Sequence, residues 1–227
     1  GRTLQDALEL AVSQIAAERV DVVCAGRTDT GVHASAQVLH FDTTAQRPLS
    51  AWVRGVNAHL PSGVAVTWSR EVDEHFHARF SALRRHYIYR IINRRAPLTV
   101  ERGFAWHMKR RLDVAKMAEA AAAFVGTHDF STFRDAECQA ESPVRTLERF
   151  DVVKNGDTID CLVSAQSFLH RQVRSMVGSL ENVGSGKWTP QDLKAALEAR
   201  DRKACGPVAP PDGLFLVKVD YPGDEVG

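Results

Sequence analysis

One short stretch, residues 20–34, constrains the fold of this chain more than any other. Residues 20–25 are mostly apolar and rich in β-branched side chains, which predicts a buried strand, and the segment that follows is bracketed by Gly26 and Gly31. Because a glycine-bracketed segment can turn sharply, we expect Asp29 on a loop at the end of a strand. Loops that a rigid strand holds in place commonly present reactive side chains.

The chemistry of this loop depends on two charged residues. Asp29 lies two positions after Arg27. A nearby guanidinium favours the ionised form of a carboxylate, so Asp29 is better suited to be a nucleophile or a charge stabiliser than a general acid. A surface turn with an incidental ion pair would have the same pattern, and these residues alone leave both interpretations open.

Composition narrows the class of protein. The chain has 227 residues, of which 44% are hydrophobic, so it can bury a full core as one large domain or two intimate halves. No apolar run approaches the roughly 20 residues that span a bilayer, and the first residues lack a signal-peptide pattern, so we expect a cytoplasmic enzyme without membrane association. The four cysteines are far apart and form no Cys-x-x-Cys pair, which predicts free thiols and no metal site.

Charge is distributed unevenly along the chain. The net charge of +1 argues by itself against a strongly nucleic-acid-binding protein. Residues 84–111, however, contain a single acid, Glu101, among many bases: Arg84, Arg85, Arg90, Arg94, Arg95, Arg102, Lys109, Arg110 and Arg111. Such a segment can line a groove that contacts phosphates, or it can be a solvated strand face and turn.

Periodicity predicts alternating helices and strands. We expect helices at residues 3–15, 49–60 and 112–124, another that carries the apolar stripe from Val173 to Leu180, and a last one that starts at Thr189. We expect strands at residues 20–25, 37–43, 64–68, 84–92, 145–153, 158–165 and 213–219. Asn155-Gly156-Asp157 predicts a hairpin turn between two of them.

The strand at residues 84–92 combines aromatic and basic side chains. Alternation places Tyr87 and Tyr89 on one face and Arg90 on the other. Tyrosines flanked by arginines can stack on a base while the guanidiniums hold phosphates, but two tyrosines in a core would give the same pattern.

The residues from Ala25 to Ala34 closely resemble the active-site motif of the tRNA pseudouridine synthase A (TruA) family. In that family the aspartate of Gly-Arg-Thr-Asp is the nucleophile, which implies this role for Asp29, and we count Arg27 among the catalytic candidates. The chain departs from the family at Thr30, where an alanine is common, and we expect this small change to leave the chemistry undisturbed.

Further segments resemble the family's other motifs, in the same order along the chain. Tyr87 takes the place of a tyrosine that packs against the target uridine, and Arg174, in a His-x-x-x-Arg helix, that of an arginine that pairs with the catalytic aspartate. Leu214 takes the place of a residue that helps to wall the uracil pocket, and residues 127–134, read physically as an aromatic-rich loop, match another signature. The residues that we expect to bind substrate are Tyr87, Leu214, Arg84, Arg85 and His33.

The resemblance implies an α+β fold. Two related halves would form one continuous, mainly antiparallel sheet covered by helices, with the active-site cleft between the halves. We place the halves at residues 1–95, with the Asp29 loop, and 96–227, with the Arg174 helix and the closing strand. The family's first strand has no counterpart in the sequence given, so we expect a vacant place in the sheet. The resemblance also implies a homodimer.

The implied activity is the isomerisation of uridine to pseudouridine at positions 38–40 of the tRNA anticodon arm, without a cofactor. The glycosidic C–N bond breaks, the uracil turns and it rejoins through carbon, so the base must leave its stack and enter an aromatic or apolar pocket. Whether Asp29 attacks the sugar or the uracil ring is left open.

Two alternative functions come from other classes of protein. Asp29-Thr30-Gly31 is the Asp-Thr-Gly of aspartic proteases, which need two such carboxylates sharing a proton, so a dimer would have to supply the second. Arg27 beside each carboxylate would oppose that sharing. A non-catalytic RNA-binding module would explain the basic and aromatic residues equally well, but it leaves unexplained why arginines should accompany one isolated aspartate.

Overall fold

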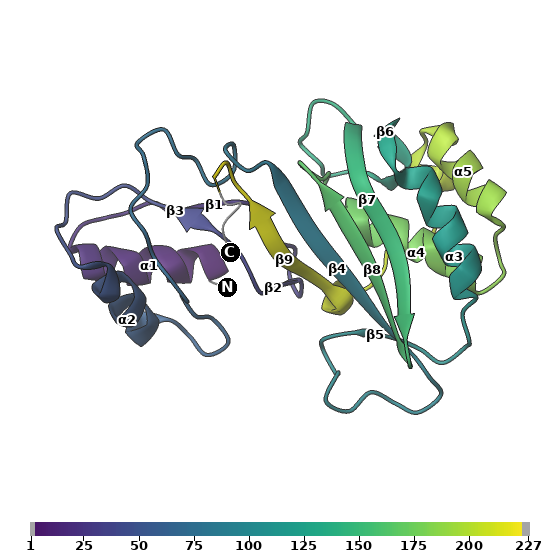
Figure 1. Ribbon diagram of the computed structural model, residues 1–227, viewed down its shortest axis with the longest axis horizontal. Helices are drawn as coiled ribbons and strands as arrows, with labels where there is room; N and C mark the ends of the chain where they lie inside the picture. Colours follow the sequence, from purple (N-terminus) through teal and green to yellow (C-terminus); the bar gives the residue numbers. More distant parts are fainter. Residues whose placement is uncertain (1–2, 224–227) are drawn as a thin grey trace. The chain divides into compact units, whose positions relative to one another are not determined.

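The computed structural model describes residues 3–223, and the chain folds into two compact units (Figure 1). Among the described residues, the first unit contains 3–26 and 38–82, and the second contains 27–37 and 83–223. The loop that carries Asp29 therefore belongs to the second unit, although the strand before it belongs to the first.

The first unit pairs two helices with a short two-stranded sheet. Helix α1 (Leu4–Ala16) begins at the predicted cap, where the Thr3 hydroxyl accepts from the Asp6 amide and the Asp6 carboxylate accepts from the Thr3 amide. Helix α2 (Leu49–His59) ends before Pro61, as predicted. Strands β1 (Val23–Cys24) and β3 (Leu39–His40) are antiparallel and shorter than predicted.

The strand predicted at residues 64–68 is wrong. The Val66 amide donates to Oδ1 of Asn57 (2.7 Å), and Nδ2 of Asn57 donates to the Val66 carbonyl (2.8 Å). An asparagine side chain on α2 thus satisfies the backbone groups that a neighbouring strand would otherwise bind. The segment forms no strand for this reason, despite its β-branched composition.

The second unit is built on a seven-stranded sheet in the order β2-β9-β4-β8-β7-β6, with β5 beside β4. Its strands are β2 (His33–Ala34), β4 (Arg84–Asn93), β5 (Trp106–Met108), β6 (Gly126–Asp129), β7 (Val144–Asn155), β8 (Thr158–Ala165) and β9 (Leu214–Asp220). The β2–β9 and β4–β5 pairs are parallel, and the others are antiparallel. The predicted hairpin joins β7 to β8, with Gly156 at a positive φ of 59°.

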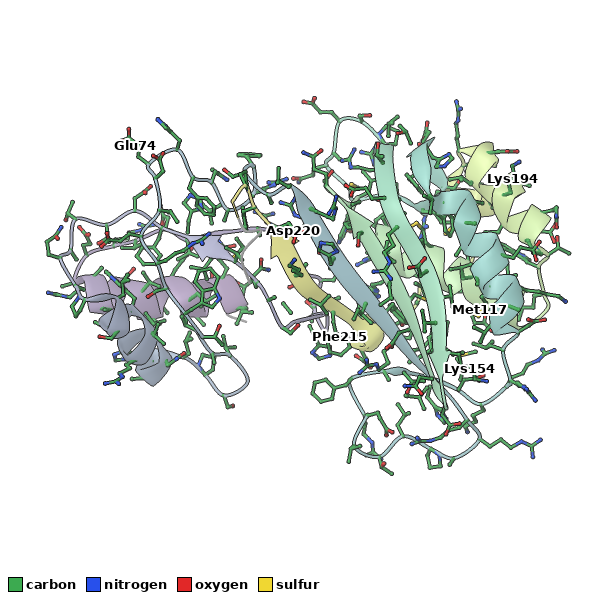
Figure 2. The ribbon with its side chains drawn as sticks, in the orientation of Figure 1. Glu74, Met117, Lys154, Lys194, Phe215 and Asp220 are labelled. Atoms are coloured by element: carbon green, nitrogen blue, oxygen red, sulfur yellow. The ribbon has the colours of Figure 1, made fainter. Side chains whose placement is uncertain are left out.

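Three helices cover one face of this sheet: α3 (Val114–Ala121), α4 (Gln172–Gly184) and α5 (Pro190–Ala199) (Figure 1). The predicted apolar stripe of α4 is confirmed, because Val173, Met176, Val177 and Leu180 are all buried. Met117 on α3, labelled in Figure 2, is also fully buried. A Cβ on Gly184 would come within 2.6 Å of its sulfur, so α3 and α4 can approach only with glycine there.

The predicted α+β class with a mainly antiparallel sheet is confirmed. Within residues 3–223 the strands form two sheets rather than one continuous sheet, because β1 and β3, each two residues long, pair with each other and with no strand of the larger sheet. The division of the chain into related halves at residue 95, with a cleft between them, stays a prediction. Between residues 3 and 223, no helix has the length and apolar content that crossing a bilayer requires.

Candidate active site

The loop that carries Asp29 is fixed to strand β9 and to the turn before it. The Val32 amide donates to the Asp29 carbonyl (3.0 Å), which closes a turn at Gly31, whose φ is +84°. A Cβ on Gly31 would lie 3.0 Å from Cγ of Pro211, so this position needs glycine both for its backbone and for its close approach. The parallel pairing of β2 with β9 then anchors the end of the loop.

The carboxylate of Asp29 is held at both of its oxygens. Nη1 of Arg174 lies 2.6 Å from Oδ2, and Nε2 of His170 lies 3.0 Å from Oδ1. The side chains of Asp29 and Arg174 are only 19% and 12% exposed, so the pair is largely shielded from solvent. The contact from Arg174 is a charge-assisted hydrogen bond, which is shorter and stronger than a neutral one. The contact between an arginine of α4 and the aspartate that the resemblance implied is present.

Arg174 is itself held by the connector that precedes β9. Its Nε donates to the Ala209 carbonyl (2.9 Å), and the Ala209 amide donates to the Arg174 carbonyl (3.1 Å). The guanidinium therefore uses one edge nitrogen on the backbone and another on the carboxylate. A lysine, with a single nitrogen at the end of its chain, cannot reproduce this arrangement.

Tyr87 and Leu214 lie on adjacent strands, β4 and β9. The Tyr87 ring meets Phe168 edge-on, with centroids 5.2 Å apart, and its strand neighbours are Leu216 on β9 and Val163 on β8. Burial raises the pKa of Tyr87 to about 12; Arg85 opposes this rise and the charge of Asp29 adds to it. The hydroxyl is therefore neutral at physiological pH. Within residues 3–223 it makes no hydrogen bond, which leaves it available to a bound molecule.

Leu214 is buried and is paired in register with Tyr89. The Tyr89 hydroxyl donates to the Pro210 carbonyl (2.7 Å), and burial raises its pKa. A Cβ on Gly213 would lie 2.8 Å from the Tyr89 ring, so the chain can pass this ring only with glycine. The start of β9 is thus packed tightly against β4.

Within residues 3–223, four other predicted site residues form no hydrogen bond or ion pair with Asp29. Arg27 is exposed and forms no ion pair within residues 3–223, so the arginine beside Asp29 is Arg174 and not Arg27. The His33 ring lies between Phe104 and Phe215, with centroids 4.9 and 4.8 Å away, and Nε2 is 2.7 Å from the Gly103 carbonyl.

Arg84 and Arg85 are engaged at the start of β4. Arg84 pairs with Glu148 and, at 3.5 Å, with Asp220. Arg85 is buried and donates to the Gln166 carbonyl. Both contacts tie β4 to neighbouring strands and connectors.

The basic segment at residues 84–111 divides into paired and unpaired arginines. Arg90 forms a bidentate pair with Asp160, and Arg94 forms one with Glu101. Among residues 84–111, all of which the structure describes, the exposed bases without an ion pair are Arg95, Arg102, Lys109, Arg110 and Arg111. Only this second group is free to meet phosphates.

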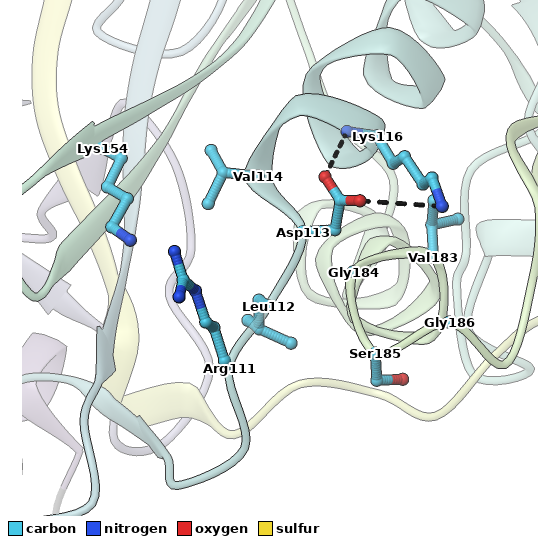
Figure 3. Close-up of a pocket in the computed structure, with 10 residues that line it drawn as sticks. All are labelled: Arg111, Leu112, Asp113, Val114, Lys116, Lys154, Val183, Gly184, Ser185 and Gly186. Atoms are coloured by element: carbon cyan, nitrogen blue, oxygen red, sulfur yellow. Dashed lines mark hydrogen bonds and ion pairs between the residues drawn. The ribbon is translucent and has the colours of Figure 1, made fainter.

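Part of the unpaired group borders a pocket of about 570 Å³ at the far end of α4 from Arg174 (Figure 3). Arg111 and Lys154 extend into it side by side, and Lys116 lies on its other side, 3.6 Å from Asp113. Three bases and one acid leave this pocket positively charged. Elsewhere in residues 3–223, no group of three or more His, Cys, Asp or Glu side chains is placed to hold a metal ion.

Sequence reasoning missed His170, which contacts the aspartate, and Asp135, which contacts His170. His170 contacts Asp29 directly, and Asp135 lies 3.6 Å from the other ring nitrogen of His170. The spacing of His170 and Arg174, four apart in the sequence, was a signal that both could reach one partner, because such residues share a helix face. Asp135 lies in a distant loop without periodicity, so no pattern pointed to it.

Fold and site together define an α+β protein with an enzyme-like carboxylate site, in which one shielded aspartate is held between an arginine and a histidine. A family model described as tRNA pseudouridine synthase matches residues 1–81 and 120–222. The chain belongs to this family.

Individual relatives agree along nearly the whole chain. A protein of Beijerinckia indica is 59% identical over 230 residues, which cover 100% of this chain and 88% of that protein. Proteins of Mesorhizobium japonicum and Sinorhizobium fredii are 56% and 54% identical, each over 97% of this chain and over 90% and 91% of their own length. All three are named tRNA pseudouridine synthase A.

Proposed function

We propose that this protein isomerises uridine to pseudouridine in tRNA, with Asp29 as the reacting carboxylate. The observation that carries the proposal is the carboxylate of Asp29 in a member of this family, held at one oxygen by Arg174 and at the other by His170. A side chain that is fixed before substrate arrives loses little entropy when it reacts.

The reaction needs no external reactant. The N1–C1′ bond of uridine breaks and a C5–C1′ bond forms, while C5 loses a proton and N1 gains one, so product and substrate have the same composition. Asp29 acts either by covalent attack or by stabilising positive charge on the sugar. We therefore propose that no cofactor takes part.

We assign supporting roles by position. Arg174 orients the carboxylate, and Tyr87 and Leu214, on adjacent strands, bound the uracil. The free, neutral hydroxyl of Tyr87 supports a hydrogen bond to the base. The substrate contacts predicted for Arg27, Arg84, Arg85 and His33 stay predictions, and for Arg84 and Arg85 the engaged side chains favour a structural role.

We further propose which part of the surface binds tRNA. The unpaired bases Arg111 and Lys154 line the pocket of Figure 3, and the exposed Lys109 and Arg110 directly precede Arg111 in the chain. Such side chains neutralise backbone phosphates whatever the sequence. On the basis of the family resemblance, we also propose that the protein modifies positions 38–40 of the anticodon arm. On the same basis we propose that its active form is a homodimer and that it is located in the cytoplasm.

The two alternatives are less well supported. An aspartic protease needs a second carboxylate that shares a proton with the first, whereas the groups in contact with Asp29 are Arg174 and His170. A pure RNA-binding module gives no reason for a shielded carboxylate fixed at both oxygens.

The proposal is tested by incubating unmodified tRNA with the protein and mapping pseudouridine by carbodiimide labelling and reverse transcription. New stops at positions 38–40 are expected. Labelling elsewhere would correct the target, and unlabelled tRNA would contradict the activity.

Light scattering during gel filtration would test the homodimer, which a monomer mass would contradict.

A further inference from the structure

The imidazole of His170 lies between two carboxylates. Nε2 is 3.0 Å from Oδ1 of Asp29, and Nδ1 is 3.6 Å from Oδ1 of Asp135. Both ring nitrogens thus contact a carboxylate oxygen, and the contact with Asp29 is the shorter of the two. His170 thus connects the Asp29 loop to the loop that carries Asp135.

The backbone of His170 is bound to the same loop. Its amide donates to Sγ of Cys138 (3.4 Å), and its carbonyl accepts from the Asp135 amide (3.2 Å). The Asp135 side chain is only 10% exposed, and its Oδ1 accepts from the Glu137 amide (3.0 Å). The position of the imidazole is therefore fixed jointly by contacts of the His170 backbone and contacts of its side chain.

Asp135 also holds the residue after His170. Nη1 of Arg171 lies 2.9 Å from Oδ2 of Asp135. Arg171 has a φ of 56°, in the left-handed region, and is the N-terminal flanking residue of α4. Residues other than glycine adopt this conformation only where their surroundings hold them. Asp135 thus stabilises the turn that aims His170 at Asp29 and begins the helix of Arg174.

Asp135 is suited to this task because it stays charged. Burial tends to raise its pKa, but the Glu137 amide, Arg171 and His170 outweigh burial and lower the pKa below its ordinary value. Arg174 occupies only one oxygen of Asp29, and a carboxylate held at one oxygen can still rotate. The contact of His170 with the other oxygen limits this rotation, and each oxygen keeps a lone pair for reaction.

We propose that His170 is a positioning residue that holds the second oxygen of Asp29, and that Asp135 in turn positions His170. The inference rests on the proposed function, because its consequence is a rate. The charged groups in contact with the imidazole are the carboxylates of Asp29 and Asp135, which in turn contact Arg174 and Arg171.

The test compares His170→Ala, His170→Gln and Asp135→Asn with wild type, in single turnover with excess protein and by tRNA binding. Removing one oriented donor should slow the chemical step by about 10-fold or more, with tRNA affinity within about 3-fold of wild type. His170→Gln keeps an N–H that can reach Asp29, so it should recover much of the rate. The single-turnover rate of Asp135→Asn should fall less than that of His170→Ala. The double variant should be little slower than His170→Ala alone, because both residues act through the contact of His170 with Asp29.

His128→Ala is the matched control, since His128 is also half-buried and its Nε2 lies 3.0 Å from a carbonyl, that of Val125, away from Asp29. It should keep the wild-type rate. The proposal would be overturned if His170→Ala reacted at the wild-type rate. It would also be overturned if His170→Gln were as slow as His170→Ala while circular dichroism showed both variants to be folded. If His170→Ala does not fold, Asp135→Asn decides: a slower rate at unchanged affinity supports the proposal, and the wild-type rate overturns it. A wild-type protein that makes no pseudouridine would instead refute the proposed function.

Discussion

At the scale of single residues, the geometry of Asp29 depends on a guanidinium that is fixed at two points. Arg174 uses Nη1 on the carboxylate and Nε on the Ala209 carbonyl. In Arg174→Lys one of these contacts must be lost. We expect a single-turnover rate about 10-fold or more below wild type, with tRNA affinity nearly unchanged. A variant that changed only affinity would show that Arg174 binds tRNA instead of orienting Asp29.

Tyr87 offers a second residue-scale prediction. Tyr87→Phe keeps an aromatic face for the uracil but loses a hydroxyl that makes no hydrogen bond within residues 3–223, so we expect a lower single-turnover rate. Tyr87→Leu should lose both the ring and the hydroxyl and be slower still. Tyr87→Phe at the wild-type rate would mean that the hydroxyl has no chemical role.

The raised pKa of Tyr87 also links stability to pH. Burial raises the pKa to about 12 from an ordinary value near 10. Between these values the folded state keeps a proton that the unfolded chain has released, so the free energy of unfolding falls as pH rises through this window. Urea denaturation of Tyr87→Phe should show a shallower fall than wild type, and equal slopes would contradict the burial of this hydroxyl.

The residue scale also shows how far sequence alone reaches. The motif resemblance identified Asp29 and Arg174 as partners, and the structure pairs them. The Ala209 carbonyl could not be found, because a backbone acceptor has no residue signature. The charge of Arg94 could be counted from the sequence, but its bidentate pair with Glu101 depends on how the intervening loop folds back.

At the scale of elements, local signals predicted those that start with a cap or show clear periodicity. Thr3 and Thr189 each begin a helix with a capping box, as their positions indicated for α1 and α5. Strands β2 and β5 have two and three residues, too few for a period to appear. The strand expected at residues 64–68 is absent because a side chain, Asn57, binds its backbone, a competition that periodicity does not describe.

The contact between α4 and the connector before β9 gives an element-scale prediction. A Cβ on Gly178 would lie 1.8 Å from the Pro207 carbonyl oxygen, so Gly178→Ala must push the connector away from the helix. An alanine would otherwise favour the helix by about 1 kcal/mol. We expect the clash to dominate, with a net loss of about 2 kcal/mol or more in the free energy of unfolding by urea.

Gly178→Ala should also slow the chemical step, because Ala209 of the same connector holds Arg174. Ala118→Ser, at an exposed position of α3, is the control and should leave stability within about 0.5 kcal/mol. A stabilised Gly178→Ala protein would show that the connector yields without cost.

At the scale of the whole molecule, a net charge of +1 conceals a local excess of unpaired bases. Replacing Arg110, Arg111 or Lys154 by alanine should weaken tRNA binding and reduce the salt dependence of its affinity by about one unit of slope each. The saturated rate should hold, because these side chains are not at the carboxylate. Filter binding across salt concentrations measures the tRNA affinity and its salt dependence.

Arg94→Ala is the matched control for this set, since Arg94 has the same charge but is paired with Glu101. The salt dependence of its tRNA affinity should stay that of wild type. A wild-type slope in Arg111→Ala and Lys154→Ala, or a reduced slope in Arg94→Ala, would show that phosphates are bound elsewhere on the protein.

The central claim is that the carboxylate of Asp29 reacts, and one measurement tests it most directly. Asp29→Asn keeps the size of the side chain and its place between Arg174 and His170 but removes the charge. Single-turnover formation of pseudouridine, measured beside tRNA affinity, should be abolished in this variant while affinity stays near wild type, because phosphate contacts supply most of the binding. Appreciable turnover by Asp29→Asn would contradict the account.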